Sequence, residues 1–224
     1  MNVDVVRVFV NVGGKHGNPL GILLEPSAMD VSERLAVTKR LGFAETVFVD
    51  SVDEGRIEIY SPSGALPFAG HPLVGTGWLL NELTGGQLTV LRPPAGDVPF
   101  WIENESAWIV GRVEDCPAWR HVQLSTPENV ESLEGPVNPT HDAVQYWAWR
   151  DASAGCVRAR VFGARFGIDE DEACGSASMM LAHQLDREIE ILHGLGSIIY
   201  ARPSNVSGQV AVGGRVTRDM SIPL

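Results

Sequence analysis

Hydrophobic and polar residues alternate through residues 1–12, which is the pattern of a half-buried β-strand. A loop over residues 13–19 separates this run from a second strand-like run over residues 20–24, so the two can form a hairpin. Two further strand-like runs cover residues 45–49 and 56–60. The first quarter of the chain is therefore predicted to be rich in strands.

One amphipathic helix is predicted between the second and third of these strands. Asp30 is followed three residues later by Glu33, which is the pattern of an N-terminal capping box. Apolar residues then recur at helical spacing up to Leu41, and Gly42 suits the left-handed conformation that ends many helices. These signals predict a helix between Asp30 and Gly42.

Two later helices are predicted to be buried. The first begins at Pro72, a residue that suits the first turn of a helix, and continues to residue 83. The second begins at Ser176 and continues to residue 186. Both are apolar on most sides, and a helix of that composition belongs in the interior of a domain.

The order of strands, buried helix and strands occurs twice along the chain. Ala69-Gly70 precedes the first buried helix, and Cys174-Gly175 precedes the second one 105 residues later. We therefore predict an α+β fold of two pseudo-symmetric halves, each a mixed β-sheet or barrel wrapped around a central helix. The halves are residues 1–108 with central helix 72–83, and residues 109–224 with central helix 176–186, with the active site in the cleft between them.

Two helix N-termini that face one cleft can bind an anion. Each offers unpaired backbone N–H groups and about half a unit of positive charge, and the glycines beside them let a ligand approach the backbone. A substrate carboxylate is the natural ligand, and the same groups can stabilise negative charge that develops during proton abstraction. Because the sequence has no phosphate loop, dinucleotide fingerprint or clustered His/Cys set, no cofactor and no metal are expected.

The net charge and the cysteine content limit which partners the protein can bind and which cellular compartment suits it. The formal net charge of −11 disfavours binding to nucleic acid or to an anionic membrane. The three cysteines have no close-spaced motif, which indicates a reduced, intracellular protein. Residues 1–12 contain Asp4 and Arg7, unlike a secretory signal, and no apolar run is long enough to span a bilayer. We therefore expect a cytoplasmic protein.

Five motifs, in order along the chain, resemble the phenazine-biosynthesis isomerase family, whose fold is that of diaminopimelate epimerase and proline racemase. They are GNP at 17–19, LGFAETVF at 41–48, PFAGHPLVGT at 67–76, GIDEDEACGSA at 167–177 and RPS at 202–204. The resemblance implies a cofactor-independent isomerase of small carboxylates, and we expect a homodimer. It also implies site residues: Glu45 as the general acid/base, His71 and Asp171 in the same cleft, and Asn18, Gly70, Gly175 and Ser176 as substrate-binding groups.

These residues also have plain structural interpretations. Glu45 can be a solvent-facing residue beside a helix cap, His71 and Ser176 can be helix N-caps, and Asn18 can stabilise a turn before Pro19. Asp171 stands in an acidic run that is normally a solvated loop. Physical chemistry supports the catalytic interpretation in one respect, because a carboxylate that works near neutral pH needs a raised pKa, which burial beside another acid provides.

Cys174 has two possible roles, since a thiolate at a helix N-terminus can be reactive. The two-thiol racemases of this fold carry a cysteine at each helix entry, whereas this chain has Ala69 at the first entry. We therefore interpret Cys174 as a packing residue. Ala65, Glu172 and Cys174 depart from common family residues, and the second half is shorter than in typical members.

Three functions remain open from the sequence. The first is an isomerase that performs an allylic or keto–enol proton shift on a small carboxylate, in secondary metabolism. The second is an amino-acid racemase or epimerase with two opposed bases. The third is a non-catalytic ligand-binding relative. The sequence does not name the substrate.

Overall fold

The first two strands, β1 (Asn2–Val10) and β2 (Asn18–Leu24), form the predicted antiparallel hairpin in the computed structural model, which describes residues 2–26 and 29–224. Helix α1 (Val31–Leu41) follows, with both bonds of the capping box present between Asp30 and Glu33. Gly42 caps its end in the left-handed conformation, with φ of 70°. The predicted hairpin and the predicted helix are both confirmed.

The first half of the chain then builds a mixed sheet against a buried helix. The elements are β3 (Thr46–Ser51), β4 (Arg56–Ser61), β5 (Gly64–Leu66) and α2 (Gly70–Leu83). Strands β2 and β3 pair in parallel, since α1 crosses over between them, and β3, β4 and β5 pair antiparallel. Strand β5 leads directly into α2.

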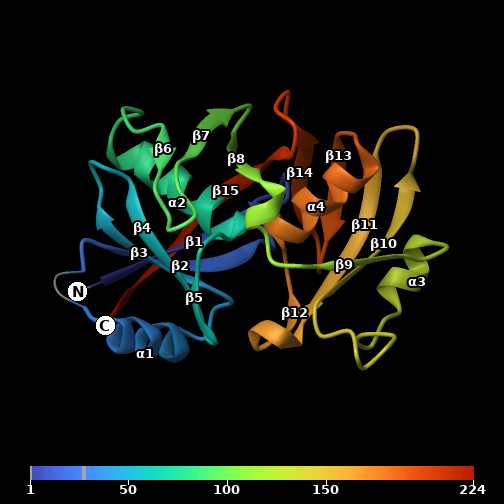
Figure 1. The fold of residues 1–224 in the computed structure, drawn as a ribbon, viewed down its shortest axis with the longest axis horizontal. Helices are drawn as coiled ribbons and strands as arrows, with labels where there is room; N and C mark the ends of the chain where they lie inside the picture. The colour runs from blue at the N-terminus through green and yellow to red at the C-terminus, as the bar shows by residue number, and fades with distance from the viewer. Residues whose placement is uncertain (1, 27–28) are drawn as a thin grey trace.

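The second half repeats this order. Its elements are β9 (Arg120–Gln123), α3 (Pro127–Glu131), β10 (Val144–Asp151), β11 (Cys156–Gly163), β12 (Ile168–Asp171) and α4 (Gly175–Leu185). Strands β9 and β10 are parallel across α3, β10 to β12 are antiparallel, and β12 leads into α4. The same sequence of pairings in both halves is what pseudo-symmetry requires, and Figure 1 shows the two lobes side by side.

The remaining strands close each lobe and join the two. They are β6 (Val90–Leu91), β7 (Val98–Glu103), β8 (Ser106–Arg112), β13 (Ile189–His193), β14 (Ser197–Pro203) and β15 (Gln209–Pro223), with short 3-10 helices η1 (Val113–Asp115) and η2 (Ala164–Phe166). Strand β15 pairs with β8 and β14 through residues 209–214 and with β1 through residues 215–223. It therefore runs from one lobe into the other (Figure 1).

Both central helices are buried, as predicted. Nearly every residue of the first two turns is inaccessible in α2 and in α4. Helix α2 begins at Gly70, two residues before the predicted start, and α4 begins at Gly175 and ends at Leu185, because Asp186 takes the left-handed C-cap position. The predicted division of the chain at residue 108 falls inside β8, which pairs with both β7 and β15. That division stays a prediction.

Within the described part of the chain, no helix combines the length and the apolar character needed to cross a membrane. The expected cytoplasmic location and the expected homodimer stay predictions.

Candidate active site

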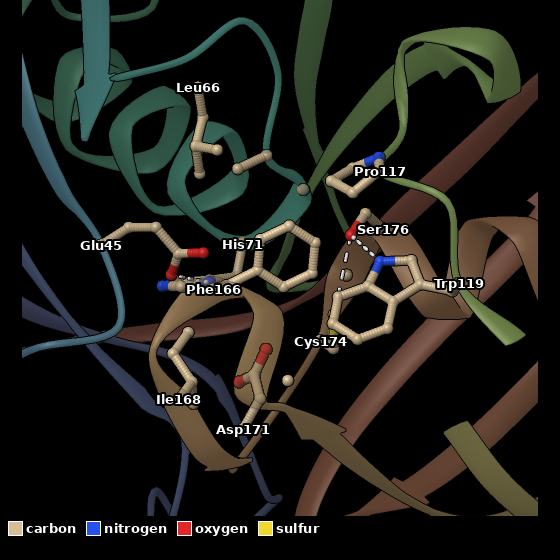
Figure 2. Close-up of a pocket in the computed structure, with 14 residues that line it drawn as sticks. Glu45, Leu66, His71, Pro117, Trp119, Phe166, Ile168, Asp171, Cys174 and Ser176 are labelled. Carbon is tan, nitrogen blue, oxygen red and sulfur yellow. Dashed lines mark hydrogen bonds and ion pairs between the residues drawn. The ribbon is translucent and has the colours of Figure 1, made fainter. Parts of the chain in front are cut away.

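A pocket lies where the starts of α2 and α4 meet, and both halves of the chain line it (Figure 2). Its lining residues are Glu45, Leu66, Ala69, Gly70, His71, Pro117, Trp119, Gly163, Phe166, Ile168, Asp171, Cys174, Gly175 and Ser176. The free volume is about 20 Å³, which is room for about one water molecule.

Gly70 and Gly175 allow the two helix starts to touch. A Cβ on Gly70 would lie 2.8 Å from the carbonyl carbon of Gly175 and 2.9 Å from the nitrogen of Ser176. A Cβ on Gly175 would lie 2.9 Å from the nitrogen of His71. The two glycines were predicted to give a ligand access to the backbone. They line the pocket, and they also let one helix start approach the other, which brings two positive helix ends to one place.

Glu45 reaches this pocket from the short loop between Gly42 and β3. The residue is only 8% exposed, so the prediction that it could be a solvent-facing residue is wrong. Its Oε2 lies 3.3 Å from Nδ1 of His71 and has no hydrogen-bond partner among the described residues. Burial raises the pKa of the Glu45 carboxyl well above its ordinary value, and the negative charge of Asp171 raises this pKa further.

His71 is the second residue of α2, and Ala69 is the N-cap, so the interpretation of His71 as an N-cap is wrong. Burial lowers the pKa of His71 to about 3. The imidazole is therefore neutral near pH 7, and its contact with Glu45 is not an ion pair. Its Nε2 has no hydrogen-bond partner among the described residues. A neutral imidazole beside a carboxyl can donate or accept a hydrogen bond.

Asp171 is the last residue of β12 and is buried, not part of a solvated acidic loop. Burial raises its pKa to about 6, although hydrogen bonds from Cys174, the Ala173 backbone N–H and Asn18 act in the opposite direction. The pKa values of Glu45 and Asp171 are thus both displaced upward in the same pocket. A pair of interacting carboxyl groups of this kind titrates as a unit.

Asn18 lies outside the lining of this pocket, on the far side of Asp171. Its Nδ2 donates to Oδ1 of Asp171 at 2.6 Å and to the carbonyl oxygen of Ala173 at 3.3 Å. The resemblance assigned Asn18 to substrate binding. In this geometry it holds the carboxyl of Asp171 in place.

Ser176 occupies in α4 the position that His71 occupies in α2, because each is the second residue of its helix. The interpretation of Ser176 as an N-cap is wrong, since Cys174 is the N-cap residue and makes no side-chain capping bond. The Ser176 hydroxyl oxygen accepts a hydrogen bond of 3.0 Å from the indole N–H of Trp119, and lies 3.6 Å from Sγ of Cys174.

Cys174 and Ala69 occupy equivalent N-cap positions at the pocket. Burial raises the pKa of the Cys174 thiol well above its ordinary value. A neutral thiol facing an alanine cannot form a pair of thiol bases. The interpretation of Cys174 as a packing residue stays a prediction that agrees with this environment.

The aromatic and apolar wall of the pocket was not predicted from the sequence. Trp119 and Phe166 pack with ring centroids 5.2 Å apart, and Pro117, Leu66 and Ile168 are further apolar residues of the lining. Trp119 and Phe166 lie on short connecting segments without a recognisable motif. For Leu66 alone, the repeat offers a signal in the sequence. Leu66 stands 105 positions before the predicted site residue Asp171, and the two residues end the equivalent strands β5 and β12.

The site can therefore exchange a proton with a bound anion. It combines two carboxyl groups of raised pKa, a neutral imidazole and two abutting helix N-termini. No group of three or more His, Cys, Asp or Glu side chains that could hold a metal ion occurs in residues 2–26 and 29–224.

Known proteins resemble this chain in sequence and in fold. A family model described as phenazine biosynthesis-like protein matches residues 6–144. Trans-2,3-dihydro-3-hydroxyanthranilate isomerase of Pseudomonas chlororaphis is 26% identical over an alignment that covers 87% of each chain. A phenazine biosynthesis PhzF family protein of Enterococcus faecalis has a TM-score of 0.80 at 15% identity, covering 99% of this chain and 97% of that one. A probable proline racemase of Agrobacterium radiobacter has a TM-score of 0.66 at 11% identity, covering 100% and 92%.

Proposed function

The chain belongs to the phenazine biosynthesis-like family and is an isomerase of that family, and from this premise we propose that it moves a proton within a small, unsaturated carboxylic acid. Glu45 is the general acid/base of this reaction. The observation that carries the proposal is a buried carboxyl of raised pKa, without a hydrogen-bond partner at Oε2 among the described residues, beside two helix N-termini.

The reaction begins with removal of a proton from carbon. The Glu45 carboxylate takes the proton of a carbon next to an unsaturated or carboxyl group, and the C–H electron pair moves into the conjugated system. The double bond shifts by one position. The protonated Glu45 then returns a proton to the other end of that system, so that no proton or electron is gained or lost overall.

The helix starts stabilise the charge that this step creates. Backbone N–H groups at the beginnings of α2 and α4 bind the substrate carboxylate and lower the energy of the anionic intermediate. His71 is neutral, and its Nδ1 lies 3.3 Å from Oε2 of Glu45, so a small shift on substrate binding would let the two hydrogen-bond. Asp171 helps to keep the pKa of Glu45 high, so that one group can act both as base and as acid near neutral pH.

An assay in deuterated water tests the proposal. Trans-2,3-dihydro-3-hydroxyanthranilate, the substrate in the name of the Pseudomonas relative, is the first compound to supply, with L-proline as a comparison. We expect a shifted double bond and incorporation of solvent deuterium at carbon in the first compound, measured by mass spectrometry and NMR. Deuterated D-proline formed from L-proline, without any change in the unsaturated acid, would contradict the proposal.

That contrary result would favour a racemase, the second candidate function. Glu45 and Asp171 line one pocket from different elements, and the pKa of each carboxyl is raised. Two such groups on opposite faces of one carbon could remove a proton from one side and supply it from the other. Chiral chromatography separates this outcome from a double-bond shift.

The dependence of activity on pH gives an independent test. Glu45 must lose its proton to act as the base, so kcat/KM should fall as the pH decreases through the raised pKa of this group. We expect the acid limb of the profile to lie above pH 4.5, the ordinary value for glutamate. Asp171→Asn removes a negative charge next to Glu45 and should move this limb to lower pH, while burial, the larger cause, keeps it above 4.5.

A limb at pH 4.5 in the wild type, or a limb that moves upward in Asp171→Asn, would contradict the assignment of Glu45. Glu134→Gln is a suitable control because Glu134 is exposed. It should leave the profile unchanged.

A further inference from the structure

Trp119 stands at the entrance of the second helix without belonging to any motif of the sequence. It lies on the segment between η1 and β9, and its indole reaches across 57 positions of sequence to Ser176. Its side chain packs against the cluster of Val161, Cys174 and Ala177. Figure 2 shows Trp119 and Ser176 together on the side of the pocket opposite Glu45.

The direction of the hydrogen bond between these residues follows from their chemistry. An indole N–H can only donate, so the Ser176 oxygen must accept from Trp119, at 3.0 Å. The Ser176 O–H is then free to point elsewhere. Cys174 Sγ, at 3.6 Å, is the near alternative in the protein, and a neutral sulfur is a weak acceptor.

A carboxylate in the pocket offers the Ser176 hydroxyl a better acceptor. Hydrogen bonds to an ionised oxygen are roughly twice as strong as those between neutral groups. A hydroxyl that already accepts one bond is also a stronger donor, because successive hydrogen bonds polarise one another. With the indole N–H in place, Ser176 turns a proton and not a lone pair toward the pocket.

We propose that Trp119 is a positioning residue, whose indole N–H holds the Ser176 hydroxyl as a hydrogen-bond donor toward the carboxylate of the substrate. This inference rests on the proposed function in one respect, since it takes the ligand of the pocket to be a carboxylate. It adds a residue outside the five motifs, contributed by the segment that leads into β9. The Trp119 ring also forms part of the wall, so a test must separate the N–H group from the ring.

Benzoate and benzamide provide that separation. Both present the same ring to the wall, but only benzoate carries a charge for Ser176 to bind. Trp119→Phe keeps an aromatic ring and removes the N–H group. We expect this variant to bind benzoate about 10-fold more weakly than the wild type and benzamide with unchanged affinity, as measured by titration calorimetry. Equal losses for both probes would mean that Trp119 is only a wall, and an unchanged affinity for benzoate would also overturn the proposal.

A double-mutant cycle tests whether Trp119 acts through Ser176. Ser176→Ala should weaken benzoate binding by a similar factor, and Trp119→Phe should add nothing further in the Ser176→Ala background. If the double variant lost benzoate affinity by the product of the two single-variant factors, the proposal would be overturned. Trp101→Phe is the matched control, because Trp101 stacks on Trp108 at a distance of 6.1 Å and does not line the pocket. This control should bind benzoate like the wild type.

An NMR signal makes the test independent of the folding of the Trp119 variant. The chain has six tryptophans, and the indole N–H resonance missing in Trp119→Phe belongs to Trp119. If that variant does not fold, single replacements of the other tryptophans assign the resonance by elimination. Because both probes bring the same ring to the wall, we expect saturating benzoate to move this resonance further than saturating benzamide in the wild type, and this difference to vanish in Ser176→Ala. If the Trp119 indole resonance of the wild type did not move when benzoate was added, the proposal would be overturned. Benzoate binding as expected, with no solvent exchange into substrate, would instead leave this inference standing and reject the proposed reaction.

Discussion

Glutamine in place of Glu45 is expected to lower turnover by at least about 10²- to 10⁴-fold, the usual contribution of a general acid/base. Glutamine keeps the size of the side chain and its hydrogen-bonding capacity, but it cannot carry a proton. Substrate affinity should change little, because the helix starts and Ser176, not Glu45, hold the carboxylate in the proposed mechanism. Deuterium uptake from solvent into the substrate should fall in parallel with turnover.

The same replacement is expected to stabilise the protein at neutral and alkaline pH. The pKa of Glu45 is raised by burial, so the stability that its protonated form contributes is complete below about pH 4.5 and is lost as the pH rises through the raised pKa. Glutamine is never ionised and avoids that loss. The melting temperature of Glu45→Gln should therefore exceed that of the wild type at pH 8, and the difference should vanish near pH 4.

Calorimetric scans at these two pH values, together with turnover assays, check the combined prediction. Glu134→Gln, at an exposed position, should change neither quantity. Glu45→Asp retains a carboxyl one methylene shorter and should show reduced but measurable turnover. Turnover and exchange near the wild-type rate in Glu45→Gln would make Asp171 or His71 the base and would reject the central assignment.

Local sequence signals were sufficient for much of the fold. Asp30, Glu33 and Gly42 specify the ends of α1 through bonds within a few residues, and these bonds are present. The two central helices are recognisable because they are apolar on most sides, which an interior position explains. The repeated order of elements then led to the two-lobed α+β fold.

The two central helices begin before the residues that the sequence predicts, because their capping is unusual. His71 and Ser176 look like N-caps in the sequence, but each helix begins earlier, and neither Ala69 nor Cys174 makes a side-chain capping bond. Close contact between the two helix ends determines the position of these residues instead. Sequence patterns report contacts within one helix, and they carry no information on contacts between Gly70 and Gly175.

The same reason accounts for the part of the site that was missed. Glu45, His71 and Asp171 could be proposed as site residues because each lies in a recognisable motif, and the structure places all three in one pocket. Trp119 and Phe166 have no such local signal. Their position depends on how connecting segments of the second half fold over the start of α4, which is a property of the tertiary structure.

Alanine in place of Gly175 is expected to damage both stability and activity, because it forces the two helix starts apart. The added Cβ would lie 2.9 Å from the nitrogen of His71 and 3.0 Å from the carbonyl carbon of Gly70, and both neighbours are backbone atoms that cannot rotate away. Overpacking of this kind costs about 1–3 kcal/mol. For a chain of this size, that loss lowers the melting temperature by about 2–12 °C.

The higher helix propensity of alanine would stabilise the Gly175→Ala variant, and this gain has to be smaller than the steric cost of the added Cβ. Alanine is a better helix former than glycine by up to about 1 kcal/mol in a helix interior. Gly175 is the first residue of α4, where less of that advantage applies. The steric term should therefore dominate, and the sign of the change in melting temperature decides between the two effects.

Activity should fall further than stability alone would suggest. The backbone N–H groups of both helix starts must lie within hydrogen-bond distance of one carboxylate, and a displacement of about 1 Å can cost on the order of 10²-fold in rate. Gly135→Ala is the matched control, because a Cβ at Gly135 meets nothing within 4 Å. Melting temperature and kcat/KM of both variants, measured with the same substrate, test the prediction. If Gly175→Ala were as stable and as active as Gly135→Ala, contact between the helix starts would not be what shapes the anion site.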